Sequence, residues 1–253
     1  MLNEAIVKIT ESLKTDERVR AIFLKGSFGR GEEDEYSDID LYCLVDETDV
    51  DEFLKDRLRH LKEYGEFLFH EDIFIVAPQI IAVYENLVHV DLFTVTEKTY
   101  INKDYMKVLN DPENRLQKFE GTQNLKLSGP EFQDAIEYVA WFLFQYKKSA
   151  DRGNDVWSVN MLHHVTTHLA RVLLHRYNPS RAQLGLKALE TSLPIEVMKK
   201  VRSIFEHMTP SGHGEAARLI VVLLKELDEW AFTEAADPQT IRPLWDRMIQ
   251  TFY

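Results

Sequence analysis

Residues 25–31 read KGSFGRG and residues 36–41 read YSDIDL, and these two motifs guide the interpretation of the whole chain. The first motif follows a short apolar run at residues 21–25, which is typical of a buried strand that ends in a turn. Gly26 allows backbone amides to approach a ligand closely, and Ser27 adds a hydroxyl donor. If a helix begins at this turn, its unpaired N–H groups form a phosphate cradle.

The second motif places two aspartates at the start of a predicted strand over residues 39–45. Asp38 and Asp40 are two residues apart, so their carboxylates project from the same face of the strand, while Ile39 and Leu41 face a core. Two parallel carboxylates repel each other unless a cation lies between them. Mg²⁺ prefers hard oxygen ligands and is often held by carboxylates together with substrate phosphates. The turn and the aspartate pair therefore predict a site for a metal-bound nucleoside triphosphate.

A third carboxylate belongs to the run VHVDLF at residues 88–93. Asp91 lies in the middle of this predicted strand among apolar neighbours, and burying a lone charge there is costly unless it is paired or metal-bound. If this strand lies beside the one that carries Asp38 and Asp40, three carboxylates converge. Three carboxylates can hold two divalent ions, which stabilise the attacking and leaving oxygens of an in-line displacement at phosphorus.

These motifs, in this order, resemble a known family. The pattern G-S-x-G-R-G, followed by S-D-I-D-L and an isolated strand aspartate, is similar to the polymerase-β-type nucleotidyltransferase superfamily. Within it, residues 26–41 resemble the antibiotic nucleotidyltransferases of the kanamycin, aminoglycoside and lincosamide types. The resemblance implies transfer of a nucleoside monophosphate, AMP from ATP, to a hydroxyl group, with release of pyrophosphate.

The resemblance also implies roles for individual residues of this chain. Gly26 and Ser27 match the positions that contact the triphosphate, and Asp38 and Asp40 match the Mg²⁺ ligands. Asp91 matches the third carboxylate, which aids metal binding or deprotonates the acceptor. The remaining matched residue is Arg30, which either bridges a phosphate or braces the loop.

The chain departs from the kanamycin-type pattern at the general base. Residues 132–136 and 143–146 are similar to the first long helix of the helical domain of those enzymes, where a glutamate accepts the proton. The matching position here is Gln145, which cannot take a proton, and those enzymes lack an aspartate where Asp91 stands. The base is therefore Asp91 or a carboxylate of the helical half, such as Glu137.

Periodicity predicts an α+β fold with two domains. The first half has helical spacing over residues 3–13 and 50–64, and strand-like runs at 73–77, 80–84 and 87–95, the last two joined by a two-residue turn. Residues 121–130 form a polar, glycine-punctuated linker, after which only helical periodicity remains. We predict a nucleotidyltransferase domain with a mixed sheet flanked by helices at residues 1–125, which binds NTP and Mg²⁺. A helical, acceptor-binding bundle follows at residues 126–253.

Composition limits the remaining possibilities. The chain has 253 residues, 45% of them hydrophobic, and 30 Lys and Arg against 42 Asp and Glu give a net charge of −12. That charge argues against stable nucleic-acid binding and favours a cationic small acceptor. No apolar run is long enough to span a membrane, and the first residues do not read as a signal peptide. A single cysteine fits the reducing cytoplasm, and the kanamycin-type resemblance implies a homodimer.

Two other functions remain compatible with the sequence. The same chemistry could modify a macromolecule, as in toxin-neutralising enzymes that adenylylate a protein, although those are usually little more than the first domain. The chain could also be a non-catalytic nucleotide-binding module that kept the fold. Retention of Asp38, Asp40 and Asp91 together argues against that loss of activity.

Overall fold

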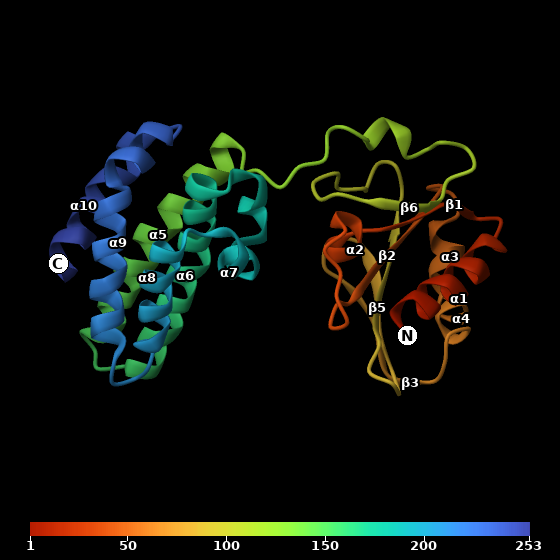
Figure 1. Cartoon of the computed structure of the whole chain (residues 1–253), viewed down its shortest axis with the longest axis horizontal. Coiled ribbons are helices and arrows are strands. Elements are labelled where there is room, and N and C mark those ends of the chain that lie inside the picture. The colour runs from red at the N-terminus through yellow and green to blue at the C-terminus, as the bar shows by residue number, and fades with distance from the viewer. The chain divides into compact units, whose positions relative to one another are not determined.

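The computed structural model describes residues 1–253. The chain divides into two compact units, Met1–Asn124 and Leu125–Tyr253 (Figure 1). The first unit contains all six strands, whereas the second contains helices only. The predicted fold class, an α+β part with a mixed sheet followed by a helical part, is confirmed.

A six-stranded sheet forms the centre of the first unit, with strand order β3-β4-β5-β2-β1-β6. β2 and β5 pair in parallel, and the other neighbours pair antiparallel. The two strands with the aspartates therefore lie side by side at the centre of the sheet, where both are paired along their lengths. The strands are β1 Val19–Leu24, β2 Ile39–Val45, β3 Phe67–Phe74, β4 Pro78–Tyr84, β5 His89–Val95 and β6 Lys107–Asn110.

Three helices cover one face of this sheet (Figure 1). They are α1 (Leu2–Lys14), α3 (Val50–Asp56) and α4 (Leu58–Lys62). The buried positions of α1 fall at helical spacing on one side, which packs on the odd-numbered residues of β2, from Ile39 to Val45. Burial of these apolar side chains fixes which face of β2 points inward, so the even-numbered Asp40 lies on the opposite face.

The opposite face has its own smaller core. Phe23, Leu44 and Phe93 pack there with Tyr100 and with the segment that contains the short 3₁₀ helix η1 (Gln117–Phe119). Aromatic stacking continues across the sheet: the ring centroids of Phe23 and Tyr42 are 5.2 Å apart, and those of Tyr42 and Phe93 are 4.4 Å apart. This packing anchors β2 and β5 on the face that carries the aspartates.

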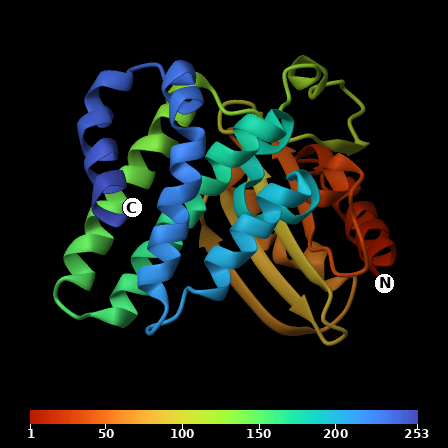
Figure 2. The same cartoon turned by 60° about the vertical axis from the view of Figure 1, so that its left-hand side comes forward.

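The second unit is built around the antiparallel pair α5 (Gly129–Ala150) and α6 (Asp155–Tyr177). A capping box starts α5, because Ser128 accepts a bond from the backbone N–H of Glu131 and Glu131 accepts one from the backbone of Ser128. α9 and α10 pack against this pair (Figure 2). No helix of the structure is both long and apolar enough to cross a membrane. The remaining elements are η2 Pro179–Ala188, α7 Leu189–Ser192, α8 Ile195–Glu206, α9 His213–Glu234 and α10 Pro238–Phe252.

Several predicted boundaries were wrong. The single helix expected over residues 50–64 is divided into α3 and α4, and the strand expected at 73–77 is β3, which lies at 67–74. The loop between β4 and β5 is four residues long, rather than the expected two-residue turn. Strand β6 was not predicted at all.

Candidate active site

The turn after β1 presses directly against the carboxylate of Asp40. Gly26 opens the five-residue helix α2 (Gly26–Arg30) with a φ of 59°, a left-handed conformation that favours glycine. A Cβ atom at this position would lie only 2.0 Å from Oδ2 of Asp40. The backbone N–H of Lys25 also donates to the carbonyl of Asp40 over 3.0 Å. Glycine is thus required both by the backbone conformation and by the space.

Ser27 supplies a second feature of this turn. Its Oγ is buried and has no hydrogen-bond partner in the structure. A buried hydroxyl without a partner costs free energy, so native proteins rarely keep one without a ligand or water to satisfy it. The hydroxyl therefore has a free hydrogen-bonding capacity at this turn, and its predicted contact with a phosphate stays a prediction.

The three predicted carboxylates come together on one face of the sheet. In the parallel pairing of β2 and β5, Asp40 lies directly opposite Asp91, and Asp38 immediately precedes β2. Asp91 is 8% exposed. The ligand atoms of Asp38 and Asp91 belong to one group within 4.8 Å, and two such hard oxygen ligands fit a divalent cation. The carboxylate of Asp40 is not part of that group and lies against the Gly26 turn. The proximity of the three residues depends on the parallel pairing of two strands that are about fifty residues apart in the chain.

His89 also belongs to this group, and the sequence analysis did not identify it. Its Nε2 lies 3.2 Å from Oδ1 of Asp91. Ligand atoms of Asp38, His89 and Asp91 all lie within 4.8 Å of one another. The hydrogen bond with Asp91 raises the pKa of His89 against the opposing effect of burial, and the charges of Asp38 and Asp40 add to the rise. The signal in the sequence was the two-residue spacing of His89 and Asp91, which puts both on the same strand face.

Arg30 ties the turn to the segment that follows β5. Its Nη1 donates to Oδ2 of Asp104 over 2.6 Å, and its Nε donates to Oε2 of Glu32 over 2.9 Å. In this structure Arg30 therefore braces the loop, which was one of the two roles left open for it.

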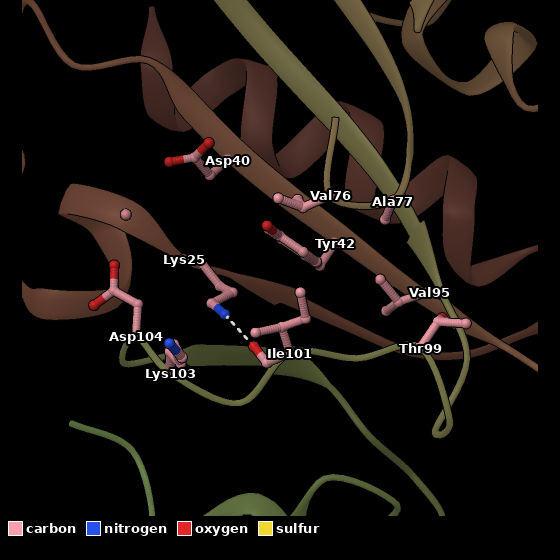
Figure 3. A pocket seen from close by; sticks show the side chains of 11 residues that line it. Lys25, Asp40, Tyr42, Val76, Ala77, Val95, Thr99, Ile101, Lys103 and Asp104 are labelled. Carbon is pink, nitrogen blue, oxygen red and sulfur yellow. Dashed lines mark hydrogen bonds between the residues drawn. The ribbon is translucent and has the colours of Figure 1, made fainter. Parts of the chain in front are cut away.

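A cavity of about 250 Å³ adjoins Gly26 and Asp40 (Figure 3). The ring of Tyr42 and the aliphatic side chains of Val76, Val95 and Ile101 line much of it. Figure 3 shows these side chains facing a shared space next to Asp40. The cavity thus adjoins Asp40, and its apolar wall is completed by polar groups that include Lys103 and Asp104.

Lys25 contributes a buried cation to the wall of this cavity. Its Nζ donates to the carbonyl of Ile101 over 2.9 Å and lies 4.9 Å from the centre of the Tyr100 ring. Burial lowers the pKa of Lys25, while the carboxylates of Asp104 and Asp40 partly oppose that change. Lys25 therefore links the strand end to the segment that covers the cavity.

The alternative base from the sequence, Glu137, lies in the second unit on α5. Its Oε1 accepts a hydrogen bond of 2.7 Å from Nε2 of Gln133. The same Gln133 nitrogen donates to the carbonyl of Asp237, so it connects Glu137 to the start of α10. Gln145 lies two turns further along α5 and is half-buried.

Comparisons with known proteins were made for sequence and for structure. Among solved structures, an aminoglycoside 6-adenyltransferase from Bacillus subtilis aligns with 13% identity and a TM-score of 0.42, over 99% of this chain and 98% of that chain. A nucleotidyltransferase-like protein from Exiguobacterium sibiricum aligns with 12% identity and a TM-score of 0.34, over 99% of this chain and 92% of that chain. No curated protein matches the sequence.

The family comparison covers the part of the chain that contains the site. Residues 6–92 match the family described as the nucleotidyltransferase domain. This range includes the turn at Gly26, the carboxylates of Asp38, Asp40 and Asp91, and His89. Residues 6–92 of the first unit are thus similar to a nucleotidyltransferase domain, and the predicted resemblance to nucleotidyltransferases is confirmed.

Proposed function

We propose that this protein is a divalent-metal-dependent nucleotidyltransferase that moves AMP from ATP to a hydroxyl group of a cationic small molecule. Aminoglycosides and lincosamides are the acceptor classes that we favour. The observation that carries the proposal is the close grouping of Asp38 and Asp91 next to Asp40, which pairs with Asp91 in the strand register and touches the Gly26 turn. The nucleotidyltransferase domain supports the reaction class, and the acceptor class rests on charge and on the sequence resemblance.

In this reaction the acceptor oxygen attacks the α-phosphorus of ATP. A new O–P bond forms, the bond from the α-phosphorus to the bridging oxygen breaks, and pyrophosphate leaves with the electron pair of that bond. Asp38, Asp40 and Asp91 would hold Mg²⁺, which neutralises the charge that develops on the phosphate oxygens. The backbone at Gly26 and the hydroxyl of Ser27 would bind the outer phosphates.

The proton of the acceptor hydroxyl needs a base. We propose Asp91, because it pairs with Asp40 in the strand register and lies with Asp38 in the group that would hold the metal. A carboxylate next to the reacting oxygen can accept its proton as the O–P bond forms.

The cavity beside Asp40 is the proposed place for the nucleoside of the donor. Tyr42, Val76 and Val95 offer an apolar surface, and Lys25 and Thr99 offer polar groups at its edge. Sites for nucleosides commonly combine such apolar walls with a few polar contacts. We further propose that residues 126–253 form the acceptor-binding domain, as the resemblance implies, and that residues 1–125 form the donor domain.

The proposal is tested by pyrophosphate release from Mg–ATP across a panel of aminoglycosides, lincosamides and buffer alone. Release that depends on one drug class, and that Asp40→Asn lowers more than about 100-fold, is the expected result. Glu63→Gln is the matched control, because it removes an exposed carboxylate of the first unit that lines neither the cavity nor the aspartate group.

Other results of this panel would lead to different conclusions. Mg²⁺-dependent ATP binding without release by any drug would mean that the acceptor is of another kind, and α-labelled ATP would then be tested for transfer to protein. ATP binding that does not depend on a divalent cation would favour a non-catalytic nucleotide-binding module and would overturn the proposal.

A further inference from the structure

The strand pairing that aligns Asp40 with Asp91 also brings a histidine next to Asp38. Ile39 pairs with Val90 and Asp40 pairs with Asp91 in the parallel register of β2 and β5. Continued by one residue, that register places Asp38 beside His89. Residues two apart on a strand share a face, so Asp38, Asp40, His89 and Asp91 form two neighbouring cross-strand pairs. One of these four possible metal ligands is a nitrogen.

One distance within this group matches that of two ligands to one ion, and the third residue is close enough to join them after a small shift. Two ligand atoms at about 2.1 Å from a metal ion and at a right angle to each other are about 3 Å apart. Nε2 of His89 and Oδ1 of Asp91 are 3.2 Å apart, so both atoms can bind one ion beside the line that joins them once the imidazole turns toward it. The ligand atom of Asp38 lies within 4.8 Å of both.

The surroundings of His89 leave few other roles for its ring. The neighbouring strand β4 places Val83 opposite His89 and Ile81 opposite Asp91. Both are apolar, so they offer no side-chain hydrogen bond to either group. His89 is partly exposed, whereas Asp91 is almost buried, so an ion would reach the group from the side of the histidine.

We propose that Asp38, His89 and Asp91 bind a divalent transition-metal ion, for which Mn²⁺ is the best candidate, in preference to Mg²⁺. An imidazole nitrogen is a favourable ligand for first-row transition ions, while Mg²⁺ strongly prefers oxygen and keeps its water. Mn²⁺ accepts carboxylates as Mg²⁺ does, and it gains from the added nitrogen. The inference rests on the proposed function, because both place a divalent ion at Asp38 and Asp91, but it puts His89 in the place of Asp40 as the third ligand and changes the preferred metal.

The test measures metal binding by the full chain, without nucleotide or acceptor. Electron paramagnetic resonance counts the free Mn²⁺ ions during a titration, and competition with Mg²⁺ gives the ratio of the two affinities. Electron spin-echo modulation then detects a ¹⁴N nucleus bonded to Mn²⁺, which reports the imidazole directly. We expect such a ¹⁴N signal, and we expect His89→Ala to abolish it and to lower the Mn²⁺-over-Mg²⁺ preference at least about 10-fold.

Two further variants separate a ligand from a purely structural role. His89→Gln keeps a side chain that can donate a hydrogen bond to Asp91 but has no basic nitrogen, so it should also lose the ¹⁴N signal and the Mn²⁺ preference. His70→Ala removes an exposed histidine from β3 of the same sheet and should change neither.

Three outcomes would overturn the inference. One is a missing ¹⁴N signal in the wild-type protein, and another is an equal loss of Mn²⁺ and Mg²⁺ affinity in His89→Ala. The third is full recovery of the Mn²⁺ preference in His89→Gln, which would mean that His89 only holds Asp91 in place. In all three cases the wild-type protein would still release pyrophosphate with Mg–ATP if the proposed function is right, whereas a failure of that function would mean no release by the wild-type protein.

Discussion

Gly26 affects both the stability of the backbone and the position of the Asp40 carboxylate in the site. Substitution by alanine would impose a left-handed backbone on a residue with a Cβ, and that Cβ would collide with the carboxylate of Asp40. We predict that Gly26→Ala lowers the free energy of unfolding by about 1–3 kcal/mol through backbone strain. Displacement of Asp40 should also weaken divalent-metal binding more than about 10-fold.

Gly31 provides the matched control for this prediction. It has a similar φ of 69°, but a Cβ there would meet nothing within 4 Å. Gly31→Ala should therefore share the loss of stability and keep metal binding. Chemical denaturation and a metal titration of both variants measure the two effects separately. Equal metal affinity in the two variants would show that contact with Asp40 does not matter.

The choice between Asp91 and Glu137 as base gives a second prediction. Asp91→Asn removes both a proton acceptor and a metal ligand, so kcat for pyrophosphate release should fall more than about 100-fold. Glu137→Gln should leave kcat within about threefold, because glutamine can still accept the bond from Gln133. Steady-state rates of pyrophosphate release, measured with the acceptor that the panel identifies, compare the two variants. The reverse order of effects would move the proton acceptor to the helical unit.

The sequence was sufficient to select Asp38, Asp40 and Asp91 as candidates, but it did not select His89. The aspartates could be selected because a two-residue spacing and an apolar strand context are local properties. The two-residue spacing of His89 and Asp91 shows only that both share a strand face, whereas the position of His89 beside Asp38 depends on the register between two strands that are far apart in the chain, which no local pattern encodes. The fit of Gly26 against Asp40 is hidden from the sequence for the same reason.

At the scale of elements, a buried ion cluster fixes the connection between α1 and β1. Asp16 accepts hydrogen bonds from Arg18 and Arg59, at 2.6 and 2.8 Å, and lies 3.2 Å from the ring nitrogen of His60. Its side chain is 3% exposed. The hydrogen bonds from Arg18 hold the pKa of Asp16 well below its usual range. Through Arg18 and Arg59 the cluster joins the segment before β1 to α4.

We predict that Asp16→Asn lowers the free energy of unfolding by about 3 kcal/mol at neutral pH. The folded-state pKa lies below the unfolded value of about 3.9, so the ionised carboxylate stabilises the fold above that value. This contribution should shrink as the pH falls below about 4, and the two proteins should become equally stable in strong acid. Urea denaturation over a pH series measures the difference.

Glu17→Gln is the control for this series, because Glu17 is an exposed neighbour outside the cluster. It should change the free energy of unfolding by less than about 0.5 kcal/mol. A pH-independent difference between Asp16→Asn and the wild type would mean that packing, and not charge, explains the effect.

The boundaries of elements were harder to predict than their existence. The pattern over residues 50–64 is helical throughout, yet the helix breaks at Arg57, which is 0% exposed. Arg57 donates hydrogen bonds to Thr94 and Asp72, two partners on strands of the sheet. The local sequence gives no sign that Arg57 is buried or that its partners lie far away in the chain, so the break in the helix could not be predicted from it. Strand β3 was misplaced because it is an edge strand with mostly exposed residues, so it lacks a clear alternation.

For the whole molecule, the distribution of charge between the two units says more about how charged substrates bind than the total net charge does. Of the 42 acidic residues, 27 lie in Met1–Asn124 together with 15 of the 30 basic residues, while Leu125–Tyr253 holds 15 of each. The entire net charge of −12 thus belongs to the unit that carries the aspartate group. A cation is attracted to such a surface, and ATP is repelled by it unless a divalent ion accompanies it.

This asymmetry predicts how the reaction depends on salt. A cationic acceptor drawn to the first unit should lose kcat/KM at least about fivefold when the salt concentration rises from about 0.02 M to about 0.2 M. The loss should appear in KM, with kcat nearly unchanged, because screening affects the encounter more than the chemical step. The kcat/KM for Mg–ATP, which keeps a net negative charge, should stay constant or rise over the same range. An acceptor KM that is insensitive to salt would show that the acceptor is not recognised through its positive charge, and it would redirect the search to neutral hydroxyl compounds.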